Sequence, residues 1–151
     1  MKIDRTALQS AIAGLLNGQR LAILATVSQE SPYCNLVSFT PSDDLQTIVF
    51  STPRSTSKYA NMLRNPNVSL LVDDRMRSGF GFTSGMAVTA LGSVEFPAKQ
   101  DEDALKGRHA ARHAGLKDFI YSPECALVRV RVARYILVSS LHEASVFEFA
   151  S

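Results

Sequence analysis

Apolar residues near the N-terminus recur every three or four positions, which is the spacing of an amphipathic helix. The repeating positions are Leu8, Ile12, Leu15 and Leu16. Asp4 or Thr6 can cap the start of this helix, and Asn17-Gly18 can end it. From residue 21 to residue 27 the pattern changes to a run that is apolar on both faces. Such a strand is buried on both sides, so we expect it in the centre of a sheet.

Two more strand patterns follow, each after a group of turn residues. A turn at 29–32 leads into a second strand at 33–40, and a turn at 41–44 leads to a third strand at 47–51. Because the three strands are consecutive and closely spaced, an antiparallel meander is the simplest pairing.

A polar loop after the third strand leads into a short second helix. Ser55 or Thr56 can cap this helix, Tyr59 and Met62 lie on its apolar face, and Asn65-Pro66 ends it. The elements expected next are strands at 68–72 and 87–96, with a polar, glycine-containing loop at 73–85 between them.

The segment after residue 100 has the charge pattern of a helix that complements its own dipole. Acidic residues open it at 101–103, and it ends near 114–115 after Arg108, His109, Arg112 and His113. The two histidines are spaced i, i+4, which a metal site can use, but no carboxylate is placed as in an HExxH motif. We therefore expect both histidines on a solvated surface, and no metal site.

The last third of the chain is again strand-like. Valine alternates with arginine over residues 128–132, which predicts a half-buried strand with one wet face, extending toward Val138. A weaker final strand covers 144–149. Six or seven strands with three helices, not alternating one for one, favour a mostly antiparallel barrel over a doubly wound parallel sheet. The expected fold class is therefore mostly β (α+β).

Length and composition narrow the function classes. The 151 residues fit one domain covering 1–151, and the formal net charge of +2 is too balanced for a nucleic-acid binder. No apolar run approaches the ~20 residues of a membrane span, and the N-terminus has no signal-peptide core, so we expect a cytoplasmic protein with no membrane partner. Cys34 and Cys125 form no CxxC pair, and the sequence predicts two buried free thiols.

The polar loop at residues 50–58 is the segment most informative for chemistry. Hydroxyl groups, the cations Arg54 and Lys58, and the start of a helix come together there. A phosphate group binds donors, positive charge and helix N-terminal amides, so the loop is a candidate phosphate site. A capped helix start with solvated charges explains the same residues, and on physical grounds alone it is the commoner case.

Three segments in order form a recognisable series. Residues 21–27, Pro32 and residues 35–39 make a hairpin, and Phe50-Ser51-Thr52 is followed six residues later by Lys58. A helix-to-strand exit then carries Asn61, Leu63, Asn65-Pro66 and Val68. The series resembles the FMN-binding split-barrel family, the superfamily of the pyridoxamine 5'-phosphate oxidases. The resemblance covers residues 20–73 well and residues 86–96 loosely.

This resemblance implies a split β-barrel that works as a homodimer and binds FMN at the dimer interface. It implies that the FMN phosphate is held by Thr52, Ser57 and Lys58, with Arg54 as an additional cation. Ser51, in the same loop, is expected among the cofactor-binding residues. The flavin ring is then lined by the backbone of Asn35, Leu36, Val37 and Ser38. The strand that carries Ala87 and Thr89 is expected to contribute from the partner subunit.

The chain also departs from the family's pattern. Cys34 and Asn35 stand where the second strand usually has an arginine, and Ala87 stands where the vitamin B6 enzymes often have a glutamine. Residues 140–144 lack the Arg-Leu-His-Asp-Arg-like signature that binds pyridoxal phosphate in those enzymes. We therefore do not expect oxidation of pyridoxamine phosphate.

Three functional hypotheses remain from the sequence. The first is an FMN-dependent oxidoreductase that acts on a small molecule, with the hydride carried by the flavin and no catalytic side chain assigned. The second is a non-catalytic binding or sensing module on the same barrel, for haem through His142, for F420 or for flavin storage. The third is a cofactor-free structural dimer, whose melting temperature would not respond to FMN.

Overall fold

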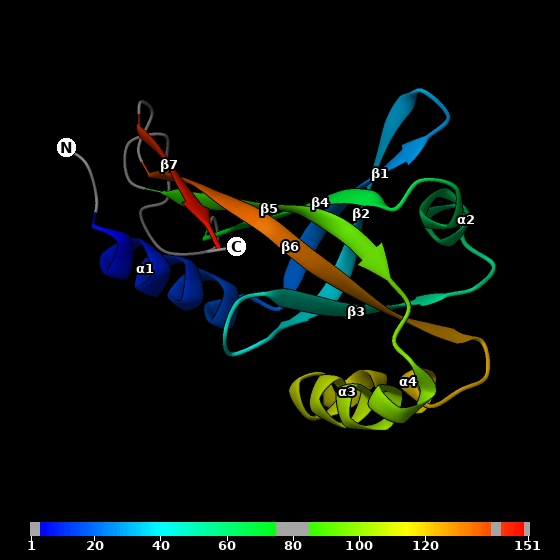
Figure 1. Ribbon diagram of the computed structural model, residues 1–151. Coiled ribbons are helices and arrows are strands. Elements are labelled where there is room, and N and C mark those ends of the chain that lie inside the picture. The colour runs from blue at the N-terminus through cyan, green and yellow to red at the C-terminus, as the bar shows by residue number, and fades with distance from the viewer. Residues whose placement is uncertain (1–3, 75–84, 140–142, 150–151) are drawn as a thin grey trace.

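The computed structural model describes residues 4–74, 85–139 and 143–149. The strands are β1 (Leu21–Ser28), β2 (Ser31–Pro41), β3 (Thr47–Pro53), β4 (Asn67–Asp73), β5 (Met86–Glu95), β6 (Cys125–Ser139) and β7 (Glu143–Glu148). The helices are α1 (Arg5–Gly18), α2 (Ser57–Arg64), α3 (Lys99–Arg112), a 3-10 turn (Ala114–Leu116) and α4 (Lys117–Ile120). Figure 1 shows how they are arranged.

All strand pairs are antiparallel, and six of the strands close into a barrel. The order along the sheet is β3-β2-β1-β4-β5-β6-β7, and β3 also pairs with β6. This second pairing closes the barrel, and β7 lies outside it, added to β6. The mostly β (α+β) antiparallel split barrel predicted from the sequence is confirmed. The apolar strand at residues 21–27 is central, as expected, because β1 pairs with both β2 and β4.

Helix α1 packs its apolar stripe into the barrel core. Asp4 is the N-cap and accepts a hydrogen bond from the backbone of Thr6, as the sequence pattern predicted. The stripe is fully buried and consists of Leu8, Ile12, Leu15 and Leu16. The helix contacts strands on several sides of the barrel, including β5 and β7. At the other side of the molecule, α2 contacts β1 (Figure 1).

The helical segment after β5 differs from the prediction in its extent. Helix α3 ends at Arg112, because His113 leaves the helical region with φ −124° and ψ 67°. A 3-10 turn and the four-residue α4 follow, and α4 is anchored by the fully buried Ile120. Four residues are too few to show a helical period, so the sequence pattern could not reveal this helix.

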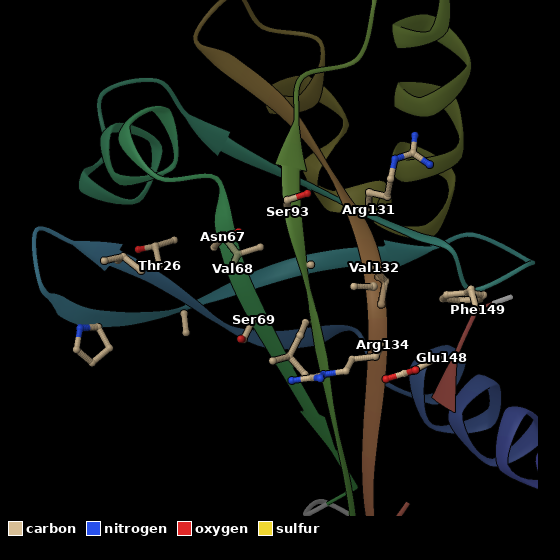
Figure 2. Close-up of a pocket in the computed structure, with 16 residues that line it drawn as sticks. Thr26, Asn67, Val68, Ser69, Ser93, Arg131, Val132, Arg134, Glu148 and Phe149 are labelled. Carbon is tan, nitrogen blue, oxygen red and sulfur yellow. The ribbon is translucent and has the colours of Figure 1, made fainter. Parts of the chain in front are cut away.

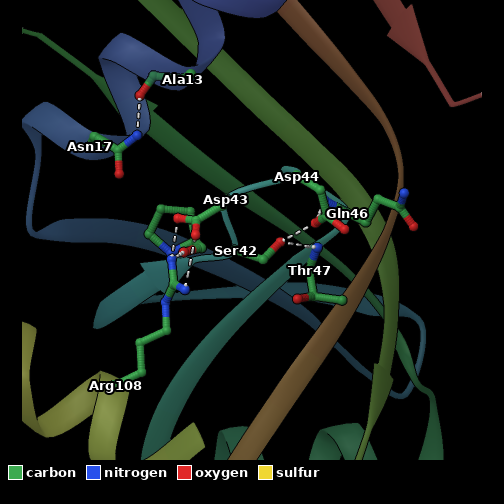
Figure 3. Close-up of polar contacts among 9 residues, drawn as sticks. Ala13, Asn17, Ser42, Asp43, Asp44, Gln46, Thr47 and Arg108 are labelled. Carbon is green, nitrogen blue, oxygen red and sulfur yellow. Dashed lines mark hydrogen bonds and ion pairs between the residues drawn. The ribbon is translucent and has the colours of Figure 1, made fainter.

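Helix α3 docks on the barrel through polar contacts rather than through an apolar stripe. Arg108 donates to a carboxylate oxygen of Asp43 at 2.7 Å (Figure 3), and Arg112 donates to the carbonyl of Phe39 at 3.1 Å. His109 and His113 are buried, so the predicted solvated surface position of both histidines is wrong. The pattern that suits a helix dipole also suits a helix whose basic face donates to strand carbonyls, and the sequence does not distinguish the two.

Strands β2 and β3 pair over only three positions and then separate. The pairs are Phe39 with Phe50, Thr40 with Val49 and Pro41 with Ile48. Beyond them, residues 31–38 of β2 pair with β1, whereas residues 51–53 of β3 pair with β6. We call this separation the fork. It positions the residues of the candidate site.

Candidate functional site

The fork leaves one edge of β2 without a strand partner in the part of the chain that the structure describes. Residues 31–38 use their other edge for β1. The chain leaves β3 at Pro53, forms α2 and enters β4 at Asn67, so the loop and the start of α2 follow directly from the β3 side of the fork. The fork therefore offers backbone N–H and C=O groups that no described strand pairs with, close to the N-terminus of α2. A cofactor that hydrogen-bonds to the backbone needs such unpaired groups.

The loop after β3 is folded onto itself by hydroxyl groups. Thr56 caps α2 by accepting from the backbone of Tyr59 at 3.3 Å. The Thr52 Oγ1 atom lies 3.0 Å from the Thr56 Oγ1 atom, and Thr52 has no exposed surface. The Thr52 hydroxyl thus shapes the loop from the inside.

Arg54, expected as an additional cation for phosphate, is held by protein carbonyls. Its guanidinium donates to the carbonyl oxygen of Cys125 at 3.0 Å and to that of Pro123 at 3.4 Å. It also donates to the Tyr59 hydroxyl at 3.3 Å. These contacts tie the loop to the start of β6, and they account for most of the donors of this side chain.

Lys58 is the cation that the loop leaves available. Its ammonium group makes no ion pair with any of the described residues, and partial burial lowers its pKa from the usual value. A half-buried ammonium without a counter-charge is stabilised by an anionic ligand. Ser57, the residue before it, is exposed in the first turn of the same helix.

Asn35 presents an unsatisfied acceptor on the β2 side of the fork. Its Oδ1 atom is buried and has no hydrogen-bond partner among the described residues. Its neighbours alternate in the way a strand requires: Leu36 is 63% exposed, Val37 is in the core and Ser38 is half-buried. Buried polar atoms without a partner are rare, so this acceptor indicates a missing donor.

Ser51 is the first residue of β3 beyond its last pair with β2, and it contacts α3. Its Oγ atom lies 3.2 Å from the His109 Nε2 atom, and the His109 Nδ1 atom lies 2.7 Å from the Thr40 Oγ1 atom. Burial, together with the positive charge of Arg112 and the proximity of His113, lowers the pKa of His109 to about 4. This contact cannot be predicted from the sequence, because a histidine on a polar helix carries no signal of which strand it will meet.

We expect the free energy of unfolding to fall by about 3 kcal/mol between pH 6.5 and pH 4 because of His109. The pKa of this histidine is 6.5 without the fold and about 4 within it. As the pH falls, the unfolded chain therefore takes up the proton first, so stability is complete above pH 6.5 and decreases down to about pH 4. The lowered pKa of His113 acts in the same direction.

Urea unfolding at pH 7, 5.5 and 4, followed by circular dichroism, measures this dependence. The variant His109→Gln carries no titrating group at this position and should lose most of the slope. A variant with the same slope as the unaltered protein would show that other groups cause it.

A row of side chains crosses the outer face of the sheet from β2 to β7. Consecutive members are register partners on neighbouring strands. We call it the outer row, and its members are Leu36, Ile23, Leu71, Thr89, Ile136 and Val146.

Ala87 lies two residues before Thr89 on β5, and its register partner on β6 is Val138, which is 40% exposed. Within one subunit, three strand steps separate Ala87 and Thr89 from β2, so the structure does not bring them to the fork.

A groove of about 940 Å³ lies beside the outer row (Figure 2). It is bordered by β1, β4, β5, β6 and the end of β7, with Arg131, Arg134, Ser69 and Asn67 among its polar side chains. None of the predicted cofactor-binding residues lines it. The groove and the predicted site are therefore separate features of the same barrel.

Within the described ranges, the cysteines and histidines give little support to metal binding or to thiol chemistry. Cys125 is buried, but Cys34 is exposed, so the expectation of two buried thiols is half wrong. No cluster of three metal-ligating side chains occurs in residues 4–74, 85–139 and 143–149. In these same ranges, no helix is long and apolar enough to cross a membrane. His142 and residues 75–84 of the loop before β5 lie outside the described residues.

Comparison with known proteins agrees with the barrel fold. A family model described as Pyridoxamine 5'-phosphate oxidase matches residues 8–139. The chain belongs to the pyridoxamine 5'-phosphate oxidase family. No curated protein sequence matches it.

Three solved structures share this fold. A haem-binding protein from Mycobacterium smegmatis superposes with a TM-score of 0.80 at 18% identity, over 90% of this chain and 56% of that protein. A putative pyridoxamine 5'-phosphate oxidase from Listeria innocua has a TM-score of 0.68 at 17% identity, over 88% and 99%. An FAD-binding protein from Mesorhizobium loti has a TM-score of 0.69 at 19% identity, over 85% and 91%. The chain thus spans just over half of the mycobacterial protein, and at these identities the likeness shows the fold.

Proposed function

We propose that this chain is a flavoprotein that binds FMN at the fork and acts as an oxidoreductase on a small molecule. The observation that carries the proposal is a pair of groups, the buried Asn35 Oδ1 acceptor, which has no hydrogen-bond partner, and the partly buried Lys58 ammonium, which has no ion pair among the described residues. FMN offers a phosphate for the cation, and hydroxyl and ring N–H donors for the acceptor. The residues present therefore fit this cofactor.

Each part of the fork has a distinct task in this proposal. Lys58 and Ser57 bind the phosphate at the start of α2, and Thr52 holds the loop in shape from inside. The unpaired edge of β2 at residues 35–38 orients the ring. Arg54 keeps the loop attached to β6. Bound FMN supplies hydride transfer, and the protein supplies binding, orientation and hydrogen bonds.

We also propose that the protein is a cytoplasmic homodimer in which the outer row is buried against a second copy. The row is apolar except for Thr89, and it includes Leu36 and Val146, which are 63% and 54% exposed. Contiguous apolar surface of this kind marks an interaction site. A second copy also explains how Ala87 and Thr89 could reach a cofactor at the fork of the partner. Two free cysteines suit a reducing compartment.

The visible absorption spectrum of the purified protein, before and after addition of FMN and removal of the excess, tests the cofactor. Paired flavin bands that persist support the proposal, and a protein that retains no FMN contradicts it. A single intense Soret band would instead identify a haem protein. Light scattering on the same sample reports the mass, and a monomer would remove the proposed interface.

We expect Lys58→Ala to weaken FMN binding by about 10- to 150-fold, the equivalent of one charge-assisted hydrogen bond. Of the two cations in the loop, Arg54 donates to protein carbonyls, whereas the Lys58 ammonium makes no ion pair with the described residues. Fluorescence titration of FMN measures the dissociation constant. Lys117→Ala, at an exposed lysine in α4, removes the same charge elsewhere and should leave it unchanged. Equal affinities of the unaltered protein and the Lys58 variant would exclude this lysine as the phosphate ligand.

A further inference from the structure

Thr40, His109 and Ser51 form a buried chain of side chains that links α3 to the fork. We propose that His109 is a positioning residue, which turns the Ser51 hydroxyl into a hydrogen-bond donor for an acceptor oxygen of the bound cofactor. This inference rests on the proposed binding of FMN at the fork, and it assigns a new role to α3 in that site.

The direction of the hydrogen bonds follows from counting donors. A neutral imidazole has one N–H and one bare nitrogen, and both ring nitrogens of His109 contact hydroxyls. The Thr40 hydroxyl is buried, and among the described residues its one partner is the Nδ1 atom of His109, at 2.7 Å. A buried hydroxyl hydrogen without an acceptor is costly, so Thr40 donates to Nδ1. The ring proton is therefore on Nε2, which donates to the Ser51 Oγ atom.

This arrangement leaves the hydrogen of the Ser51 hydroxyl free. The Ser51 oxygen accepts from His109 at 3.2 Å, and its own O–H has no acceptor among the residues that the structure describes. Ser51, the least buried of the three side chains, is partly exposed and stands where β2 and β3 separate. Its hydroxyl is thus set to donate, and phosphate, ribityl and ring carbonyl oxygens of FMN are acceptors.

Because His109 stays neutral, the directions of its two hydrogen bonds stay the same. The ring is completely buried, and the groups from β2 and β3 that touch it are uncharged hydroxyls. The charged and titratable groups that act on it, Arg112 and His113, both disfavour its protonation. Arg108, Arg112 and His113 hold α3 through contacts of their own, so replacement of His109 leaves the docking of the helix in place.

The position of the ring proton can be measured without any cofactor. Nitrogen-15 NMR of the imidazole distinguishes the two neutral tautomers. A proton on Nε2 of His109 at pH 7 supports the proposal, and a proton on Nδ1 overturns it, because Nε2 would then accept from Ser51.

A double-mutant cycle on FMN affinity tests the cofactor contact. Ser51→Ala and His109→Phe should each weaken binding by about 3- to 10-fold, the range of one hydrogen bond. The double variant should bind no more weakly than Ser51→Ala alone, because His109 acts through Ser51. Losses that multiply would show that the two residues act independently, which overturns the inference and leaves the proposed function standing. Failure of the unaltered protein to bind FMN would overturn both.

Two further variants distinguish a positioning role of His109 from a general effect on the folding of α3. His109→Gln keeps an amide donor toward Ser51 and should bind FMN within about twofold of the unaltered protein, since one donor replaces another. A folded Gln variant that binds as weakly as the Phe variant contradicts the proposal. His113→Phe is the matched control, because His113 contacts the Phe39 carbonyl and not Ser51. Its FMN affinity should not change, and a loss as large as that of His109→Phe would point to a general effect of α3.

Discussion

Gly92→Ala is expected to lower the free energy of unfolding by about 3 kcal/mol or more, the upper range for overpacking in a protein interior. Gly92 lies in β5 at the point where the register with β6 shifts by one residue. A Cβ atom on this residue would stand 2.2 Å from the backbone oxygen of Arg131 and 2.9 Å from its carbonyl carbon. Because both neighbours are backbone atoms, no side-chain rotation can relieve the clash.

The effect of Gly92→Ala is measured by thermal unfolding, where about 3 kcal/mol corresponds to roughly 6–12 °C in a chain of this size. Gly107→Ala provides a matched control. Gly107 is an exposed residue of α3, and nothing lies within 4 Å of a Cβ atom built on it. Alanine is the better helix former, so that variant should gain about 0.5–1 kcal/mol. A loss of less than about 1 kcal/mol for Gly92→Ala would mean that the bulge relaxes easily.

Arg112→Met is expected to cost about 3 kcal/mol, because three carbonyl groups lose a charged donor at once, and only that of Phe39 keeps a second contact, with His113. Arg112 donates to the carbonyls of Leu16, Gln19 and Phe39. The first two are at the C-terminus of α1, whose last carbonyls have no partner within the helix. One guanidinium thus joins α1, β2 and α3. Methionine keeps the length and apolar stem of the side chain, so the loss isolates the donors.

Urea unfolding of Arg112→Met should be compared with that of Arg108→Met. Arg108 pairs with Asp43, whose side chain is 92% exposed, and donates to one carbonyl, that of Pro41, so its loss should cost less than the loss of Arg112. Arg112→Lys should fall between the two, since one ammonium cannot reach all three carbonyls. Equal losses for the Arg108 and Arg112 variants would contradict the bridging role of Arg112.

The elements that the sequence predicts well are those governed by local rules. The stripe of α1, its Asp4 cap and the Thr56 cap of α2 depend on residues a few positions apart. The alternation of β6 is local as well. By contrast, the docking of α3 depends on contacts such as that of His109 with Thr40, 69 residues earlier, and no local pattern encodes them. The exposed position of Cys34 follows from the fork in the same way, because it depends on where β2 loses its second neighbour.

For the candidate site, the sequence shows which residue types gather in the loop but not which contacts each side chain makes. The loop from Ser51 to Lys58 does join β3 to α2, as its composition indicates. The roles of individual side chains depend on which ones the protein itself satisfies. Thr52 and Arg54 bond to protein atoms, while Lys58 and the Asn35 acceptor do not. Such a division depends on three-dimensional neighbours, which a linear motif does not contain.

The closure of the barrel by β3 and β6 also constrains how the chain can be made. Residues 47–53 pair with residues 125–131, so β3 is without its second neighbour until more than seventy further residues have left the ribosome. During that interval the edge of β3 and the core side chains beside it are exposed to other nascent chains. Long-range pairing of this kind is slow and exposes the chain to aggregation. The barrel can therefore close only after residues 125–131 have emerged, and slower translation between β3 and β6 should lengthen the time for which the edge of β3 is exposed.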